Sequence, residues 1–86
     1  MSPYSMESYN QNGLLAEAVV RTLEQYFDDL DGEKPLPVYD MVMKCIEKPM
    51  IQFVFERVNG NQSTAANLLG INRNTLRRKL VDYGLL

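Results

Sequence analysis

Residues 62–83 read QSTAANLLGINRNTLRRKLVDY, and this stretch decides the fold. It predicts a short helix over 62–69, a three-residue turn, and a last helix from 73 to about 83. Gly70 suits the turn because glycine accepts a left-handed backbone at little cost. Asn72 is a preferred N-cap for the last helix. Two helices joined by a short glycine-containing turn form a helix-turn-helix unit.

The apolar residues of this stretch have the spacing that such a unit requires. Ala66 is small where the two helices must press together, Gly70 follows four residues later, and Leu76 comes six residues after that. In the first helix of the unit, Ala65, Leu68 and Leu69 are expected on the inner side. Leu76 is expected to fill the shared core, and Leu80 and Tyr83 lie on the same face of the last helix. The unit therefore has a defined inner side, and its remaining residues are free to face a ligand.

The polar residues on the other side indicate that the ligand is duplex DNA. Arginine can bind the O6 and N7 atoms of guanine in a bidentate manner, and asparagine can do the same for adenine. Free N–H groups and hydroxyls at the start of the preceding helix suit phosphate contacts. The candidate DNA-binding residues are Asn61, Gln62, Ser63, Thr64, Asn72, Arg73, Asn74, Thr75, Arg77, Arg78 and Lys79.

The distribution of charge supports this interpretation. The total formal charge is −2, but residues 1–56 carry four basic and ten acidic side chains. Residues 57–86 carry five basic side chains against Asp82 alone. An acidic body with a basic end indicates a polyanion that docks at that end. A solvated basic helix face is the simpler alternative for the charge pattern taken alone.

Two helices are expected before this unit. The first, 14–30, carries an apolar stripe and ends at Asp31-Gly32. The second runs from about 38 to 58 and is apolar on nearly its whole circumference, including Phe53 and Phe55. A helix of this kind must be buried on all sides, and a chain of 86 residues offers too few neighbours. A second copy of the chain could supply them, so we expect a homodimer.

The predicted fold is therefore all-α, with a four-helix subunit and a C-terminal helix-turn-helix. We expect residues 1–13 to form a flexible arm, residues 14–58 to be the dimerisation helices, and residues 59–86 to be the DNA-binding unit.

The C-terminal stretch closely resembles the Fis family (factor for inversion stimulation), and the same element ends activators of the NtrC type. The resemblance rests on GNQSTAA at 60–66, LGINRNTLRRKL at 69–80 and Tyr83-Gly84, and continues more weakly upstream to about residue 14. It implies an intertwined homodimer and a nucleoid-associated regulator of transcription that bends DNA. It also implies that Asn72 and Arg73 reach bases. The residues implied to contact mainly the backbone are Asn61, Ser63, Thr75, Arg77, Arg78 and Lys79.

This chain departs from the family pattern at three places. Val81-Asp82 stands where well-known members have two lysines, which puts strong contacts to the DNA flanks in doubt. Glycine is usual at the position of Asn74. The arm before residue 14 is short and lacks strand-like alternation, so the hairpin of some relatives is not expected here.

Other functional classes have less support. The chain has no histidine, and its one cysteine, Cys45, lies in an apolar run where a buried and inert thiol is expected. We therefore expect no enzyme activity, no metal, no cofactor and no small-molecule substrate. No apolar run has the length of a membrane span, and we expect a cytoplasmic protein on the nucleoid. The alternatives that remain are a helical protein-interaction module and an accessory subunit without DNA specificity of its own.

Overall fold

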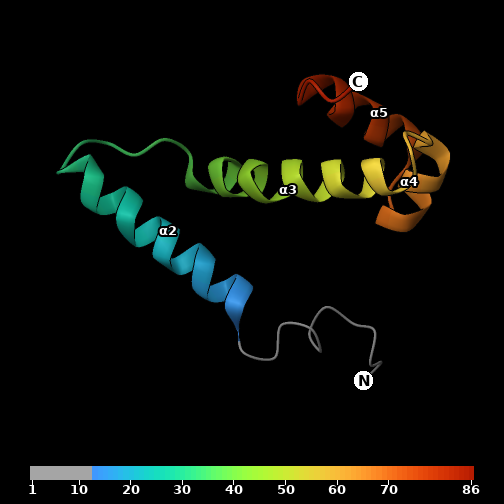
Figure 1. The fold of residues 1–86 in the computed structure, drawn as a ribbon. Helices are drawn as coiled ribbons and strands as arrows, with labels where there is room; N and C mark the ends of the chain where they lie inside the picture. Colours follow the sequence, from blue (N-terminus) through green and yellow to red (C-terminus); the bar gives the residue numbers. More distant parts are fainter. Residues whose placement is uncertain (1–12) are drawn as a thin grey trace. The chain divides into compact units, whose positions relative to one another are not determined.

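The computed structural model describes residues 13–86, and every regular element in this part of the chain is a helix (Figure 1). The elements are α2 (Leu14–Leu30), α3 (Val38–Arg57), α4 (Gln62–Leu69) and α5 (Arg73–Asp82). Within residues 13–86 the predicted all-α fold with four helices is confirmed, and each predicted helix end lies within one residue of its observed position. Residues 1–12 of the expected arm lie outside the described residues. The chain divides into two compact units, Met1–Val38 and Tyr39–Leu86.

In the first unit, helix α2 is amphipathic but buries none of its side chains. It begins after Gly13, which has a φ of 67°, and ends at Asp31, which has a φ of 49°. Its apolar face includes Leu14 at 66% exposure and Phe27 at 49%. Burial of an apolar stripe is the main source of stability for most protein helices. Among the described residues of the first unit, none buries this face.

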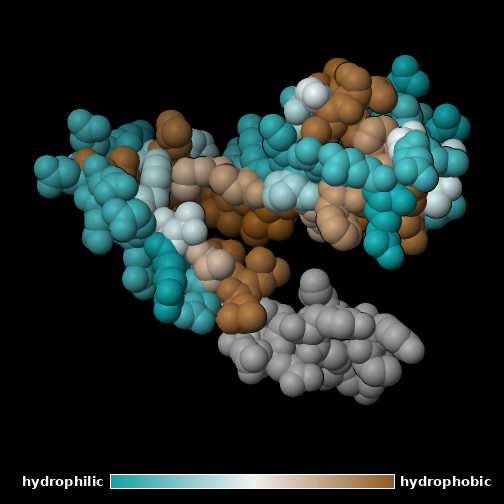
Figure 2. Space-filling model, in the orientation of Figure 1, coloured by the Kyte–Doolittle hydropathy of each residue, from teal (hydrophilic) through white to brown (hydrophobic). Residues whose placement is uncertain are grey.

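In the second unit, helix α3 has a covered side and an uncovered side. Ile51 is buried, and Val54, Phe55 and Val58 pack against the same core. Large apolar side chains on other positions of the helix stay exposed, namely Tyr39, Met43, Met50 and Phe53. Figure 2 shows apolar side chains gathered along α3. Within the second unit no described residue covers this side of the helix, and its burial by a second copy of the chain stays a prediction.

The core of the second unit joins the end of α3 to the two helices that follow. Its buried residues are Ile51, Ala65, Ala66, Leu76 and Leu80. Ala65 and Ala66 leave room for α5 to approach α4 closely, and Leu76 and Leu80 fill the space between them. Tyr83 packs against this core as predicted.

Two predictions about burial are wrong for the single chain. Leu68 was expected on the inner side of α4, but its side chain is 64% exposed, because Ala65, Ala66 and Leu69 occupy that side. Cys45 was expected to be buried, but it is exposed on α3. It lies more than a helical turn before the part of α3 that packs against the core.

Candidate nucleic-acid interface

The turn between α4 and α5 is held by its own backbone. Gly70 adopts a φ of 74° and its N–H donates to the carbonyl of Ala66 over 2.9 Å. The N–H of Ile71 donates to the same carbonyl over 3.1 Å. A residue with a Cβ would be strained at this φ, although no atom outside its neighbours lies within 4 Å of that position. Gly70 is therefore required for the direction of the chain and not for space.

Asparagine caps the first turn of both helices in the unit. The Oδ1 atom of Asn61 accepts a hydrogen bond from the Thr64 N–H over 3.0 Å. The Oδ1 atom of Asn72 accepts one from the Asn74 N–H over 2.7 Å. Each cap uses the amide oxygen and leaves the amide NH2 of the same side chain as a donor. Asn72 can therefore fix the start of α5 and still present hydrogen-bond donors to a ligand.

The exposed face of α5 carries cations and hydrogen-bonding groups. Leu76 and Leu80 are fully buried on the inner side of the helix. The predicted contact residues occupy the positions before and between them. The predicted contact residues of the helix that are exposed are Arg73, Asn74, Thr75, Arg77 and Arg78, and Val81 and Asp82 are exposed in its last turn. Among the described residues, no carboxylate pairs with any of these three arginines. The face is thus a group of unneutralised guanidinium ions on a rigid helix.

The start of α4 adds a second group of polar residues. Asn61, Ser63 and Thr64 are exposed, and their role as DNA contacts stays a prediction. Gln62 is half-buried, and its Oε1 atom is buried without a hydrogen-bond partner. The first N–H groups of a helix attract anions, and hydroxyl side chains beside them add donors. This end of α4 therefore suits a phosphate, with Gln62 contributing less than the sequence alone suggested.

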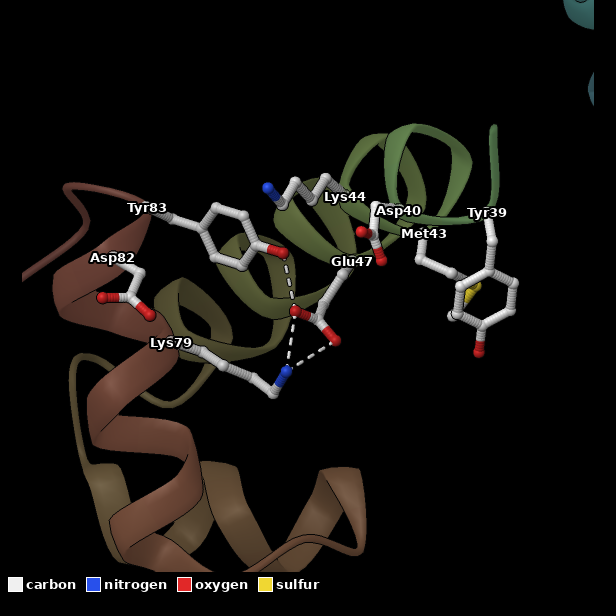
Figure 3. Close-up of a pocket in the computed structure, with 8 residues that line it drawn as sticks. All are labelled: Tyr39, Asp40, Met43, Lys44, Glu47, Lys79, Asp82 and Tyr83. Atoms are coloured by element: carbon white, nitrogen blue, oxygen red, sulfur yellow. Dashed lines mark hydrogen bonds and ion pairs between the residues drawn. The ribbon is translucent and has the colours of Figure 1, made fainter. Parts of the chain in front are cut away.

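Lys79 differs from the other cations of α5 because it is engaged within the protein (Figure 3). Its Nζ atom donates to both carboxylate oxygens of Glu47 on α3, each over 2.9 Å. The hydroxyl of Tyr83 donates to Oε1 of the same carboxylate over 2.6 Å. Lys79 remains a sequence prediction as a DNA contact, but its ammonium group already has a partner in the free protein.

These contacts shift two pKa values. The hydrogen bond from the Tyr83 hydroxyl and then the one from Lys79 lower the pKa of the Glu47 carboxyl. The bond to Glu47 raises the pKa of Tyr83 to about 12. The carboxylate therefore stays ionised and the phenol stays protonated at neutral pH.

Sequence reasoning did not identify Glu47 as a functional residue. It lies 32 residues before Lys79, and no local spacing links the two. With Lys79 and Tyr83 it lines a groove between α3 and α5, whose other lining residues are Tyr39, Asp40, Met43, Lys44 and Asp82.

The described residues hold no group of histidine, cysteine or acidic side chains that could bind a metal ion. Within the same part of the chain, no helix has the length and hydropathy needed to cross a membrane. The chemistry that the site can perform is the binding of a ligand through arginine, asparagine and hydroxyl groups.

These features define the class of protein: an all-α chain with a C-terminal helix-turn-helix whose outer face is suited to DNA. The family model described as "Bacterial regulatory protein, Fis family" matches residues 43–83. The chain belongs to the Fis family.

Curated relatives agree with this assignment. The chain is 51% identical over 72 residues to a Fis-like DNA-binding protein of Neisseria meningitidis serogroup A, which is 84% of this chain and 91% of the relative. It is 57% identical over 65 residues to a Fis-like DNA-binding protein of Ralstonia nicotianae, which is 76% of this chain and 84% of the relative. The predicted resemblance is confirmed, and the family is one of regulatory proteins that bind DNA.

Proposed function

We propose that this protein is a sequence-preferring regulator of transcription that binds duplex DNA as a homodimer, bends it, and acts on the nucleoid in the cytoplasm. The observation that carries the proposal is the exposed face of α5, where Arg73, Arg77 and Arg78 have no acidic partner among the described residues. A recognition helix that enters the major groove needs such a face near its N-terminus.

The roles of the residues differ with their position on the helix. Asn72 and Arg73 are at the N-terminal end of α5, where side chains of a recognition helix reach base edges. Arg77 and Arg78 lie one turn later and face the sugar-phosphate backbone. Ser63 at the start of α4 binds a second phosphate. Base contacts then set sequence preference, and phosphate contacts set register and general affinity.

The uncovered apolar surface supports a homodimer. None of the side chains of α2 is buried, and α3 exposes Met50 and Phe53 as well as Met43. A surface of this kind on a small chain is covered by a partner in solution. A second copy is the partner that we propose, because members of the Fis family form intertwined homodimers through the equivalent helices. Two recognition helices held close together in such a dimer require the DNA to bend before both can enter the groove.

The proposed function is tested by selecting bound sequences from a random duplex library and titrating the selected duplex with salt. Binding should weaken steeply as salt rises, because each phosphate contact releases counterions. Arg77→Ala with Arg78→Ala should weaken selected and random duplexes alike. A gel series in which the site moves along a fragment of fixed length measures the bend. If no duplex is bound at low salt, the protein-interaction module is the better interpretation.

A further inference from the structure

Lys79 is less available to bind a ligand than the other cations of α5. Arg73, Arg77 and Arg78 are exposed, whereas the side chain of Lys79 is 32% exposed and points toward α3. Its partner, the Glu47 side chain, is 22% exposed. Partly buried ion pairs are screened by salt much less than exposed ones. The Lys79 charge is therefore balanced before any DNA arrives.

The same carboxylate holds two successive turns of α5. Lys79 and Tyr83 are four residues apart, so they lie on one face of the helix. Glu47 accepts two bonds from the ammonium and one from the hydroxyl. Figure 3 shows both side chains reaching Glu47 from α5 while Glu47 extends from α3. Three charge-assisted bonds converge on one residue that lies outside the helix-turn-helix.

We propose that Glu47 is a positioning residue of the DNA-reading surface, which fixes the C-terminal half of α5 on α3 and keeps the Lys79 ammonium from the phosphates. The part that concerns phosphates rests on the proposed DNA-binding function, and the part that concerns α5 does not. A phosphate that took Lys79 would leave a half-buried carboxylate without its cation and next to a second anion. That exchange is unfavourable, so Lys79 adds less to DNA affinity than its charge suggests.

The salt dependence of binding to a random duplex measures whether Glu47 keeps the Lys79 charge from the phosphates. Glu47→Gln keeps the size of the side chain but removes its charge, so Lys79 becomes free to pair with phosphate. The slope of log K against log salt should steepen by up to about 0.9 for each protomer. Combining this change with Lys79→Met should return the slope to the wild-type value. Lys79→Met alone should reduce the slope by less than half as much as the matched change Arg78→Met.

A further variant separates freed charge from loosened packing. Tyr83→Phe removes one bond to Glu47 but leaves the ion pair, so it should lower the thermal midpoint and leave the slope at the wild-type value. If Tyr83→Phe steepens the slope as Glu47→Gln does, the effect comes from packing, and the proposal that Glu47 keeps Lys79 from the phosphates is refuted. An unchanged slope in Glu47→Gln refutes the proposal as well. So does a reduction of the slope in Lys79→Met that equals the reduction in Arg78→Met.

The positioning of α5 is tested without DNA. Urea unfolding of the wild type, Glu47→Gln, Lys79→Met and the double variant forms a double-mutant cycle. The effects of the two single changes on the unfolding midpoint should add to more than the effect of the double change. If they add without coupling, the pair does not hold α5, and the inference about Glu47 fails whether or not the protein binds DNA. If the cycle shows coupling but the wild-type protein binds no duplex, only the proposed function is overturned.

Discussion

Phe53→Ala should dissociate the protein into monomers. In the single chain Phe53 is 65% exposed on α3, whereas Phe55 packs against the helix-turn-helix core. An aromatic side chain buries about 150–250 Å² when covered, so a partner copy would cover roughly 100–160 Å² of Phe53. At about 25 cal/mol per Å² this contributes about 2.5–4 kcal/mol for each protomer and roughly twice that for the dimer. The dissociation constant of the dimer should rise by at least about a thousandfold.

Sedimentation velocity over a range of protein concentrations measures this change. Leu68→Ala is the matched control, because Leu68 is 64% exposed but lies on α4, away from the proposed dimer surface. The control should sediment as the wild type does at every concentration. A Phe53→Ala protein that stays dimeric at nanomolar concentration would refute the reasoning, and so would a wild-type protein that is a stable, folded monomer.

Three further predictions concern DNA binding and stability. Arg73→Ala should reduce discrimination between selected and random duplexes by about 1–3 kcal/mol, and an equal loss on both duplexes would contradict its role in base reading. Val81→Lys with Asp82→Lys should steepen the salt dependence of binding and leave the ranking of sites unchanged. Identical slopes would show that this end of α5 never approaches the phosphates. The hydrogen bonds from Tyr83 and Lys79 lower the pKa of Glu47 in the folded protein. The ionised Glu47 should therefore stabilise the fold above the ordinary carboxyl pKa, and this stabilisation should be lost as pH falls through the lowered pKa. Glu47→Gln should therefore lose less stability than the wild type in urea unfolding between about pH 6 and about pH 3.

The helices and their ends could be predicted from the sequence because the signals for them are local. Gly70 with its positive φ and Asn72 with its cap to Asn74 act within a few residues of the helix ends that they define. The 3.6-residue period similarly assigns Leu76 and Leu80 to one face, and both are fully buried. The same period predicts that the arginines are exposed, because they lie on the helix faces away from Leu76 and Leu80.

Contacts between distant positions could not be predicted in this way. Leu68 and Leu69 are adjacent in the sequence and equally apolar. Only the packing of α4 on α5 shows that Leu69 faces the core and Leu68 does not. Phe53 and Phe55 on α3 were both expected to be buried, but the sequence did not say which of them packs against the helix-turn-helix.

The local order of the elements, the position of the turn and the outward face of α5 were therefore determined by the sequence alone, because capping and helical periodicity act over a few residues. The tertiary structure decided which charges of that face are available. Lys79 looks equivalent to the arginines beside it until α3 brings Glu47 within 2.9 Å, across 32 residues of chain. Such a pairing depends on how the helices pack, and helix packing is set by the shape of the whole core.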